Sequence, residues 1–231
     1  PDGLELPRGG TVATWQALAA RHRGSYPVQL AAGQALASAG AREEAIAAYE
    51  HAAALVPIAV GPDSPRARIA ELAERSGDLR RVLRELTSLV ADDHTNIDAA
   101  RKLAQIARRL GDGSALALAY DRIVTIDPFD ATAHSALGRI AVERRDTTVA
   151  LREFRAALAA GPVDPAAAHC DLSEALLMNG QRADAKKEVL AALEIAPTYE
   201  RAQELLLRIV EGKAPGTGSA PDRGESHHDL P

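Results

Sequence analysis

Apolar residues recur along most of the chain in steps of three and four, and short breaks rich in glycine, proline or charge separate the apolar stretches. This spacing is typical of amphipathic α-helices. In one stretch, Ala150, Phe154 and Ala157 lie on the same helix face, and Pro162 follows where the helix must end. The alanines allow a neighbouring helix to come close, and the phenylalanine ring fits between them. The pattern predicts packed helical hairpins.

The same spacing repeats through the chain. Pro128, Pro162 and Pro197 are separated by 34 and 35 residues, Pro57 ends an earlier copy, and His94 ends the weakest copy. Each copy carries five residues at corresponding positions, two in its first helix and three in its second, and these are called the marked positions of the repeat. In chain order these are Ala32, Gly33, Ala45, Tyr49 and Ala52; Ile69, Ala70, Val82, Leu86 and Leu89; Leu103, Ala104, Leu116, Tyr120 and Ile123; Leu137, Gly138, Ala150, Phe154 and Ala157; and Leu172, Ser173, Ala185, Val189 and Ala192. A period of this length is typical of stacked helical hairpins.

This pattern resembles the tetratricopeptide repeat (TPR) family. The family's 34-residue unit has Leu-Gly in its first helix, Ala, an aromatic residue and Ala in its second, and Pro at its exit, and the unit ending at Pro162 matches it closely. The resemblance covers residues 26–199 and implies an all-α fold, a right-handed α-solenoid of stacked helix-turn-helix (TPR) repeats with a non-catalytic role in protein–protein interaction. The family's early first-helix tryptophan is replaced here by Gln29, Arg66, Ala100, His134 and His169.

The repeat predicts how the whole chain is organised. We expect an extended segment at 1–10, a half repeat of second-helix type at 11–25, five repeats, a helix of first-helix type at 200–212 and a flexible tail at 213–231. The repeats are expected at 26–59, 63–96, 97–130, 131–165 and 166–199. A longer loop is expected at 57–65. Residues able to take a positive φ are favoured between paired helices, and these positions carry Gly40, Gly77, Gly111 and Gly180.

Both ends of the array are incomplete repeats. Trp15 and Leu18 stand where a second helix carries its aromatic residue and the small residue after it, and Thr11 is a suitable N-cap. Two interpretations remain open. In the first, the C-terminal helix is a solvating helix and a missing domain covers the N-terminal helix. In the second, the last helix of one molecule pairs with the first helix of the next and builds an open filament. The apolar residues of the last helix, part of which we expect to stay uncovered, are Leu205, Leu206, Leu207, Ile209 and Val210.

Composition and charge narrow the range of partners and compartments. The net charge of −5 argues against nucleic acid or an anionic membrane as the main partner. Cys170 is the single cysteine, so we expect no intrachain disulfide. The chain starts at Pro1 and carries no signal or membrane-spanning pattern, so we expect a soluble product that is processed, exported or a fragment, and the compartment stays open. The excess of arginine over lysine is typical of GC-rich bacterial genomes.

The sequence carries no recognisable catalytic or metal-binding motif. His134 and His169 occupy the same place in consecutive repeats, but no carboxylate or cysteine stands at a ligand spacing beside them, and we expect half-buried rings. Cys170 has no histidine placed to activate it, so we expect a buried, inert thiol. The prediction is therefore no catalytic residue, no metal, no cofactor and no enzyme activity in this chain.

The resemblance also implies a binding face, because the first helices of TPR proteins form the ligand-binding side. On this face we place Arg101, Gln105, Arg108, Arg109 and Arg139, bordered by Glu71, Glu74 and Glu174. The arginines can bind the carboxylates of an acidic protein or peptide, although the same residues are also typical of a solvated helix face. We favour a protein-binding scaffold that self-assembles head-to-tail. The alternative is an accessory recognition domain of a larger bacterial hydrolase or peptidase whose catalytic part lies upstream of residue 1.

Overall fold

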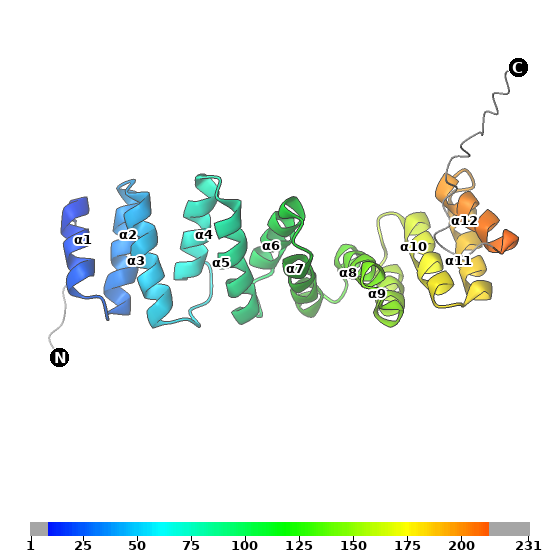
Figure 1. The fold of residues 1–231 in the computed structure, drawn as a ribbon, viewed down its shortest axis with the longest axis horizontal. Coiled ribbons are helices and arrows are strands. Elements are labelled where there is room, and N and C mark those ends of the chain that lie inside the picture. The colour runs from blue at the N-terminus through cyan, green and yellow to red at the C-terminus, as the bar shows by residue number, and fades with distance from the viewer. Residues whose placement is uncertain (1–8, 213–231) are drawn as a thin grey trace, which may run out of the picture. The chain divides into compact units, whose positions relative to one another are not determined.

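The computed structural model describes residues 9–212, and the predicted tail and most of the predicted N-terminal segment lie outside this range. Within it the chain forms twelve α-helices and no strand (Figure 1), so the all-α prediction is confirmed. The helices are α1 (Val12–Arg21), α2 (Tyr26–Ser38), α3 (Arg42–Leu55), α4 (Pro65–Arg75), α5 (Leu79–Asp92), α6 (Ile97–Leu110), α7 (Gly113–Ile126), α8 (Ala131–Glu143), α9 (Thr147–Ala159), α10 (Pro165–Met178), α11 (Arg182–Ile195) and α12 (Glu200–Glu211). None of them is long and apolar enough to cross a bilayer.

The helices pack as consecutive hairpins within two compact units, Pro1–Ile140 and Ala141–Pro231. In the first unit α2 packs on α3, α4 on α5 and α6 on α7, while α1 packs on α2, α3 on α4 and α5 on α6. In the second unit α10 packs on α9 and α11, and α12 packs on α11. The helices α2 to α6, α10 and α11 therefore each bury one stripe against one neighbouring helix and another stripe against a second, as expected of a helical repeat.

The marked positions of the repeat form the buried core. Ala45, Tyr49 and Ala52 of α3 are at most 3% exposed, and Ala150, Phe154 and Ala157 of α9 are equally buried. The closest approach is at Gly33, where a Cβ atom would lie 2.7 Å from the ring of Tyr49. Small first-helix residues thus leave room for the ring of the second helix.

The turns between paired helices confirm the glycine prediction and add a residue to it. Gly40, Gly77, Gly111 and Gly180 have φ angles between 70° and 78°. The corresponding turn after α8 has Arg145 at the same repeat position, with φ of 60°. A side chain in this conformation costs about 1 kcal/mol or more relative to glycine, so this turn is held by its neighbours.

The predicted longer loop lies between α3 and α4, and a buried carboxylate from the next hairpin holds it. Asp93, 5% exposed, accepts a hydrogen bond from the Gly61 N–H at 3.1 Å and others from the backbone and hydroxyl of Thr95 at 3.1 and 3.0 Å. Burial raises the pKa of Asp93, but these hydrogen bonds outweigh it and hold the pKa below its ordinary value. The loop is therefore fixed to the end of α5.

Candidate functional site

A groove on α6 brings together four of the predicted binding residues. Arg101, Gln105, Arg108 and Arg109 are all exposed and follow one another at steps of four, three and one, which places them on one side of the helix. They line a groove of about 510 Å³. The sequence missed the residues that complete its lining, of which Tyr120 of α7, Asp130 and Thr132 are the polar ones.

The arginines of this groove differ in how firmly they are held. The Arg108 guanidinium donates to the hydroxyl of Tyr120, whose ring is 5% exposed and therefore rigid. Arg101 lies 3.8 Å from Asp130, which is a loose ion pair, and its side chain is 54% exposed. Among the described residues no carboxylate pairs with Arg109. The groove thus presents one fixed guanidinium and two that remain accessible to an anion.

The predicted acidic border in the first unit is neutralised by neighbouring cations. Glu71 forms ion pairs with Arg68 at 3.0 Å and with Arg75, both on its own helix α4. Glu74 pairs with Lys102, which ties α4 to α6. Because each carboxylate already has a partner, the positive charge of the α6 groove is not cancelled by these residues.

The remaining predicted binding residues, Glu174 and Arg139, are not among the residues that line the α6 groove. Glu174 belongs to the second unit, where it accepts from Arg201 at 3.0 Å; Arg201 also donates to Asp171 at 2.6 Å. Burial lowers the pKa of Arg201, but the two carboxylates outweigh it and raise the pKa above its ordinary value. Arg139 is exposed on α8 and does not line the groove. Four of the eight predicted residues therefore line the α6 groove.

The terminal helices divide the predicted self-assembly residues into packed and exposed ones. In α1 Trp15 is 8% exposed and Leu18 is half-buried. In α12 Leu205 and Ile209 are buried and Leu206 is half-buried. Leu207 and Val210 are 58% and 65% exposed.

The contacts and burial of His169 and Cys170 indicate structural roles for both residues. His169 is half-buried, and its Nδ1 lies 2.7 Å from a carboxylate oxygen of Glu188. Cys170 is fully buried, and this burial raises the pKa of its thiol to about 11. The thiol therefore stays protonated near neutral pH, which removes its nucleophilic form. Within residues 9–212 no three His, Cys, Asp or Glu side chains gather into a metal-binding cluster.

Comparisons with known proteins extend only to solved structures. No family model and no curated protein matches this chain. One similar structure is YrrB, described as a TPR protein with an unusual peptide-binding site; it is 16% identical over 84% of this chain and 98% of that one, with a TM-score of 0.49. Another is MamA, which is 19% identical over 78% of this chain and 97% of that one, with a TM-score of 0.46. A third is a thermophilic TPR protein from Thermus thermophilus, which is 20% identical over 81% of this chain and 98% of that one, with a TM-score of 0.41.

The fold assignment rests on the chain's own features. A 34-residue period, helix pairs of matching length, left-handed turns between them and buried small and aromatic residues at fixed positions occur together in residues 26–199. These features define an all-α repeat fold built from helical hairpins, of the kind found in TPR proteins.

Proposed function

We propose that this chain is a non-catalytic protein-binding scaffold that holds an acidic peptide segment in the α6 groove. The observation that carries the proposal is the set of three exposed arginines on one side of α6, of which Arg108 is fixed by Tyr120 and Arg109 lacks a carboxylate partner among the described residues. The chain as a whole is acidic, with a net charge of −5. The positive charge of the groove therefore attracts anions to this part of a chain that otherwise repels them.

Fluorescence anisotropy with a labelled hexaglutamate peptide tests this proposal. Arg109→Glu should weaken binding at least about tenfold, because it removes an accessible guanidinium and adds repulsion. Arg80→Glu on α5 makes the same change of charge outside the groove and serves as the matched control. Absence of binding by the unaltered chain, or equal losses in the two variants, would overturn the proposal.

A second function, head-to-tail self-assembly, is supported by the repeat positions of the exposed α12 residues. Leu207 stands at the place of Gly33, Ala70, Ala104, Gly138 and Ser173, and Val210 at the place of Leu36, Ala73, Ala107, Ala141 and Leu176. All ten of these residues are buried. In a complete hairpin the second helix covers this side, as Tyr49 covers Gly33.

The first helix offers a matching surface. Leu18 of α1 is half-buried, whereas its counterparts in the complete repeats, Ala52, Leu89, Ile123, Ala157 and Ala192, are all buried. We infer that α1 of one molecule covers Leu207 and Val210 of another, which repeats the packing found within the chain. Because the contact is heterologous, its repetition builds a filament wherever the rotation between successive molecules does not close a ring.

Light scattering across a concentration series, with electron micrographs of the largest species, tests self-assembly. The double variant Leu207→Gln, Val210→Gln should lower the average mass toward that of one chain. Val163→Gln, which alters a fully exposed residue away from α12, should leave the mass unchanged. A single-chain mass for the unaltered protein at all concentrations contradicts this second function.

A further inference from the structure

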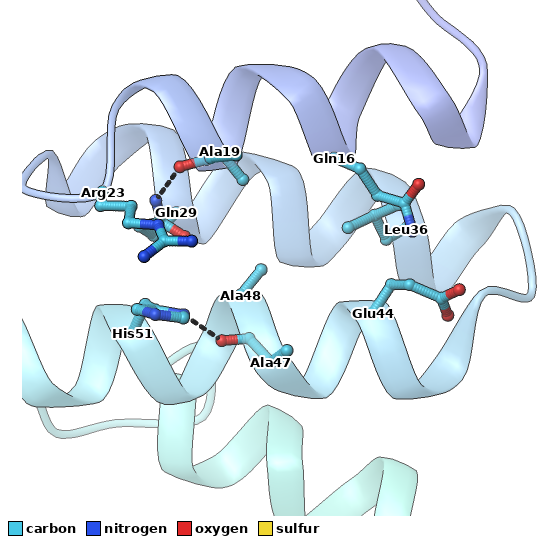
Figure 2. Close-up of a pocket in the computed structure, with 10 residues that line it drawn as sticks. Gln16, Ala19, Arg23, Gln29, Leu36, Glu44, Ala47, Ala48 and His51 are labelled. Atoms are coloured by element: carbon cyan, nitrogen blue, oxygen red, sulfur yellow. Dashed lines mark hydrogen bonds between the residues drawn. The ribbon is translucent and has the colours of Figure 1, made fainter.

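A second groove lies between α1 and α3, with α2 as its floor (Figure 2). Its volume is about 250 Å³, which suits a few side chains rather than a folded partner. Its walls are the alanines Ala19 and Ala20 of α1 and Ala47 and Ala48 of α3, and Leu36 lies on its floor. The groove is therefore apolar along its middle.

The two ends of the groove carry opposite charges. Arg23 and His51 lie together at one end, and Gln16 and Glu44 lie at the other (Figure 2). Among the described residues, neither Arg23 nor Glu44 has an ion-pair partner. The Nδ1 of His51 bonds the carbonyl oxygen of Ala47 at 2.8 Å, so its Nε2 is the nitrogen left for a ligand. A ligand with one negative and one positive group would complement both ends.

The floor of the groove is held in place before any ligand binds. Gln29 of α2 is 1% exposed, and its Nε2 donates to the carbonyl oxygens of Ala19 at 2.7 Å and His22 at 3.1 Å. These bonds fix the C-terminal end of α1 against α2. A preformed groove loses less entropy on binding than one that must be ordered.

The corresponding place between α3 and α5 is closed by side chains. There Arg66 and Glu85 stand at the repeat positions of Gln29 and Ala48 and form an ion pair at 3.4 Å, and Arg81 pairs with Glu50. In the second unit His169 and Glu188 occupy the same two positions and are 2.7 Å apart. Ala48 therefore stands where the second and fifth repeats carry a carboxylate that fills the space, whereas the third repeat carries Ala119.

We propose that the groove between α1 and α3 binds an extended peptide segment with an acidic, an apolar and a basic residue at positions i, i+2 and i+4. Such residues share one side of an extended chain and span roughly 13 Å. The groove runs from Gln16 of α1 to Arg23, two residues beyond the end of this helix, over roughly 10 Å, and the long side chains at its ends add reach. The acidic residue meets the Arg23 guanidinium, the apolar residue lies on the alanines, and the basic residue meets Glu44. This site is separate from the α6 groove.

The probe for this site is a capped, fluorescein-labelled peptide containing Asp-Thr-Leu-Thr-Lys, measured by fluorescence anisotropy with the full chain. Ala48→Glu, which introduces the carboxylate found at this position in the second and fifth repeats, should weaken binding at least about tenfold. Arg23→Glu, at an exposed position where folding is not at risk, should do the same. A neutral probe with Asn-Thr-Leu-Thr-Gln should also bind at least about tenfold more weakly.

Two controls make the outcome decisive. Ala17→Glu adds the same charge to an exposed position of α1 outside the groove and should change the affinity less than about twofold. Arg109→Glu should leave this probe unaffected, because it alters only the α6 groove. Absence of probe binding by the unaltered chain, or an equal loss in Ala17→Glu and Arg23→Glu, overturns the proposal without affecting the proposal for α6.

Discussion

The junction of α1, α2 and α3 and the junction of α3, α4 and α5 are built on the same repeat positions but differ in what fills them. The first has Gln29 and Ala48 and remains an open groove, while the second has Arg66 and Glu85 and is closed by an ion pair. The helix pairs are the same in both. Hairpin geometry is therefore set by the small and aromatic core residues, and the openness of each junction is set by a few polar positions above the core.

The largest expected effect comes from the core position that supports the open junction. Gly33→Ala should lower the free energy of unfolding by about 2 kcal/mol, because the new methyl group would meet the buried Tyr49 ring and force it to move. The opposite change at the same position of the next hairpin, Ala70→Gly, should cost about 1 kcal/mol through lost helix propensity. Urea denaturation followed by circular dichroism compares them, and a neutral or stabilising Gly33→Ala would contradict the packing argument.

Removing the carboxylate of the closed junction should have the next largest effect. Glu85→Ala leaves the half-buried guanidinium of Arg66 without its partner and should lower stability by about 1–2 kcal/mol. Glu50→Ala breaks the more exposed pair with Arg81 and should cost less than about 0.5 kcal/mol. Equal losses in the two variants would show that burial of the Glu85 pair does not matter.

Converting the closed junction into the open one sharpens the comparison further. The double variant Arg66→Gln, Glu85→Ala reproduces the residues of the first junction. It should be more stable than Glu85→Ala alone because the half-buried guanidinium of Arg66 is removed, while Arg84, which also pairs with Glu85, is exposed to water in both variants. Thermal denaturation of both variants measures the difference. A double variant less stable than the single one would show that Arg66 stabilises the junction through contacts other than this ion pair.

The smallest effect concerns the longer loop, which belongs to the closed junction alone. The pKa of Asp93 is lowered in the folded chain, so its contribution is fully present above the ordinary pKa near 3.8 and is lost as the pH falls through the lower folded value. Asp93→Asn should therefore be less stable than the unaltered chain by about 1 kcal/mol at pH 7. This difference should shrink as the pH falls below about 4, and a constant difference would contradict the assigned hydrogen bonds.

Much of the fold follows from the sequence because its signals are local. The spacing of Ala150, Phe154 and Ala157 predicts the buried side of α9, and Gly40, Gly77, Gly111 and Gly180 predict turns with positive φ; the structure confirms both. Arg145 escaped prediction because no local signal marks an arginine for this conformation. Surrounding structure imposes it.

The candidate sites were less predictable because they depend on residues distant in the sequence. The α6 arginines could be placed on one side of a helix by spacing, but their contacts with Tyr120 and Asp130 come from other segments. The predicted border residues Glu71 and Glu74 proved to be paired, which spacing cannot reveal. No feature of the sequence predicted the groove between α1 and α3, because the alanines that line it are also typical of a helical core.

The sequence by itself determined the repeat period, the helix pairs and their turns, since each depends on side-chain size and backbone preference within one 34-residue unit. Only the tertiary structure decided which polar residues meet. Arg66 and Glu85 are 19 residues apart and close one junction, while Gln29 turns to the backbone of α1 and leaves another open. The physical reason is that helix formation is governed by neighbours along the chain, whereas hydrogen bonds and ion pairs between helices depend on distances that packing alone sets.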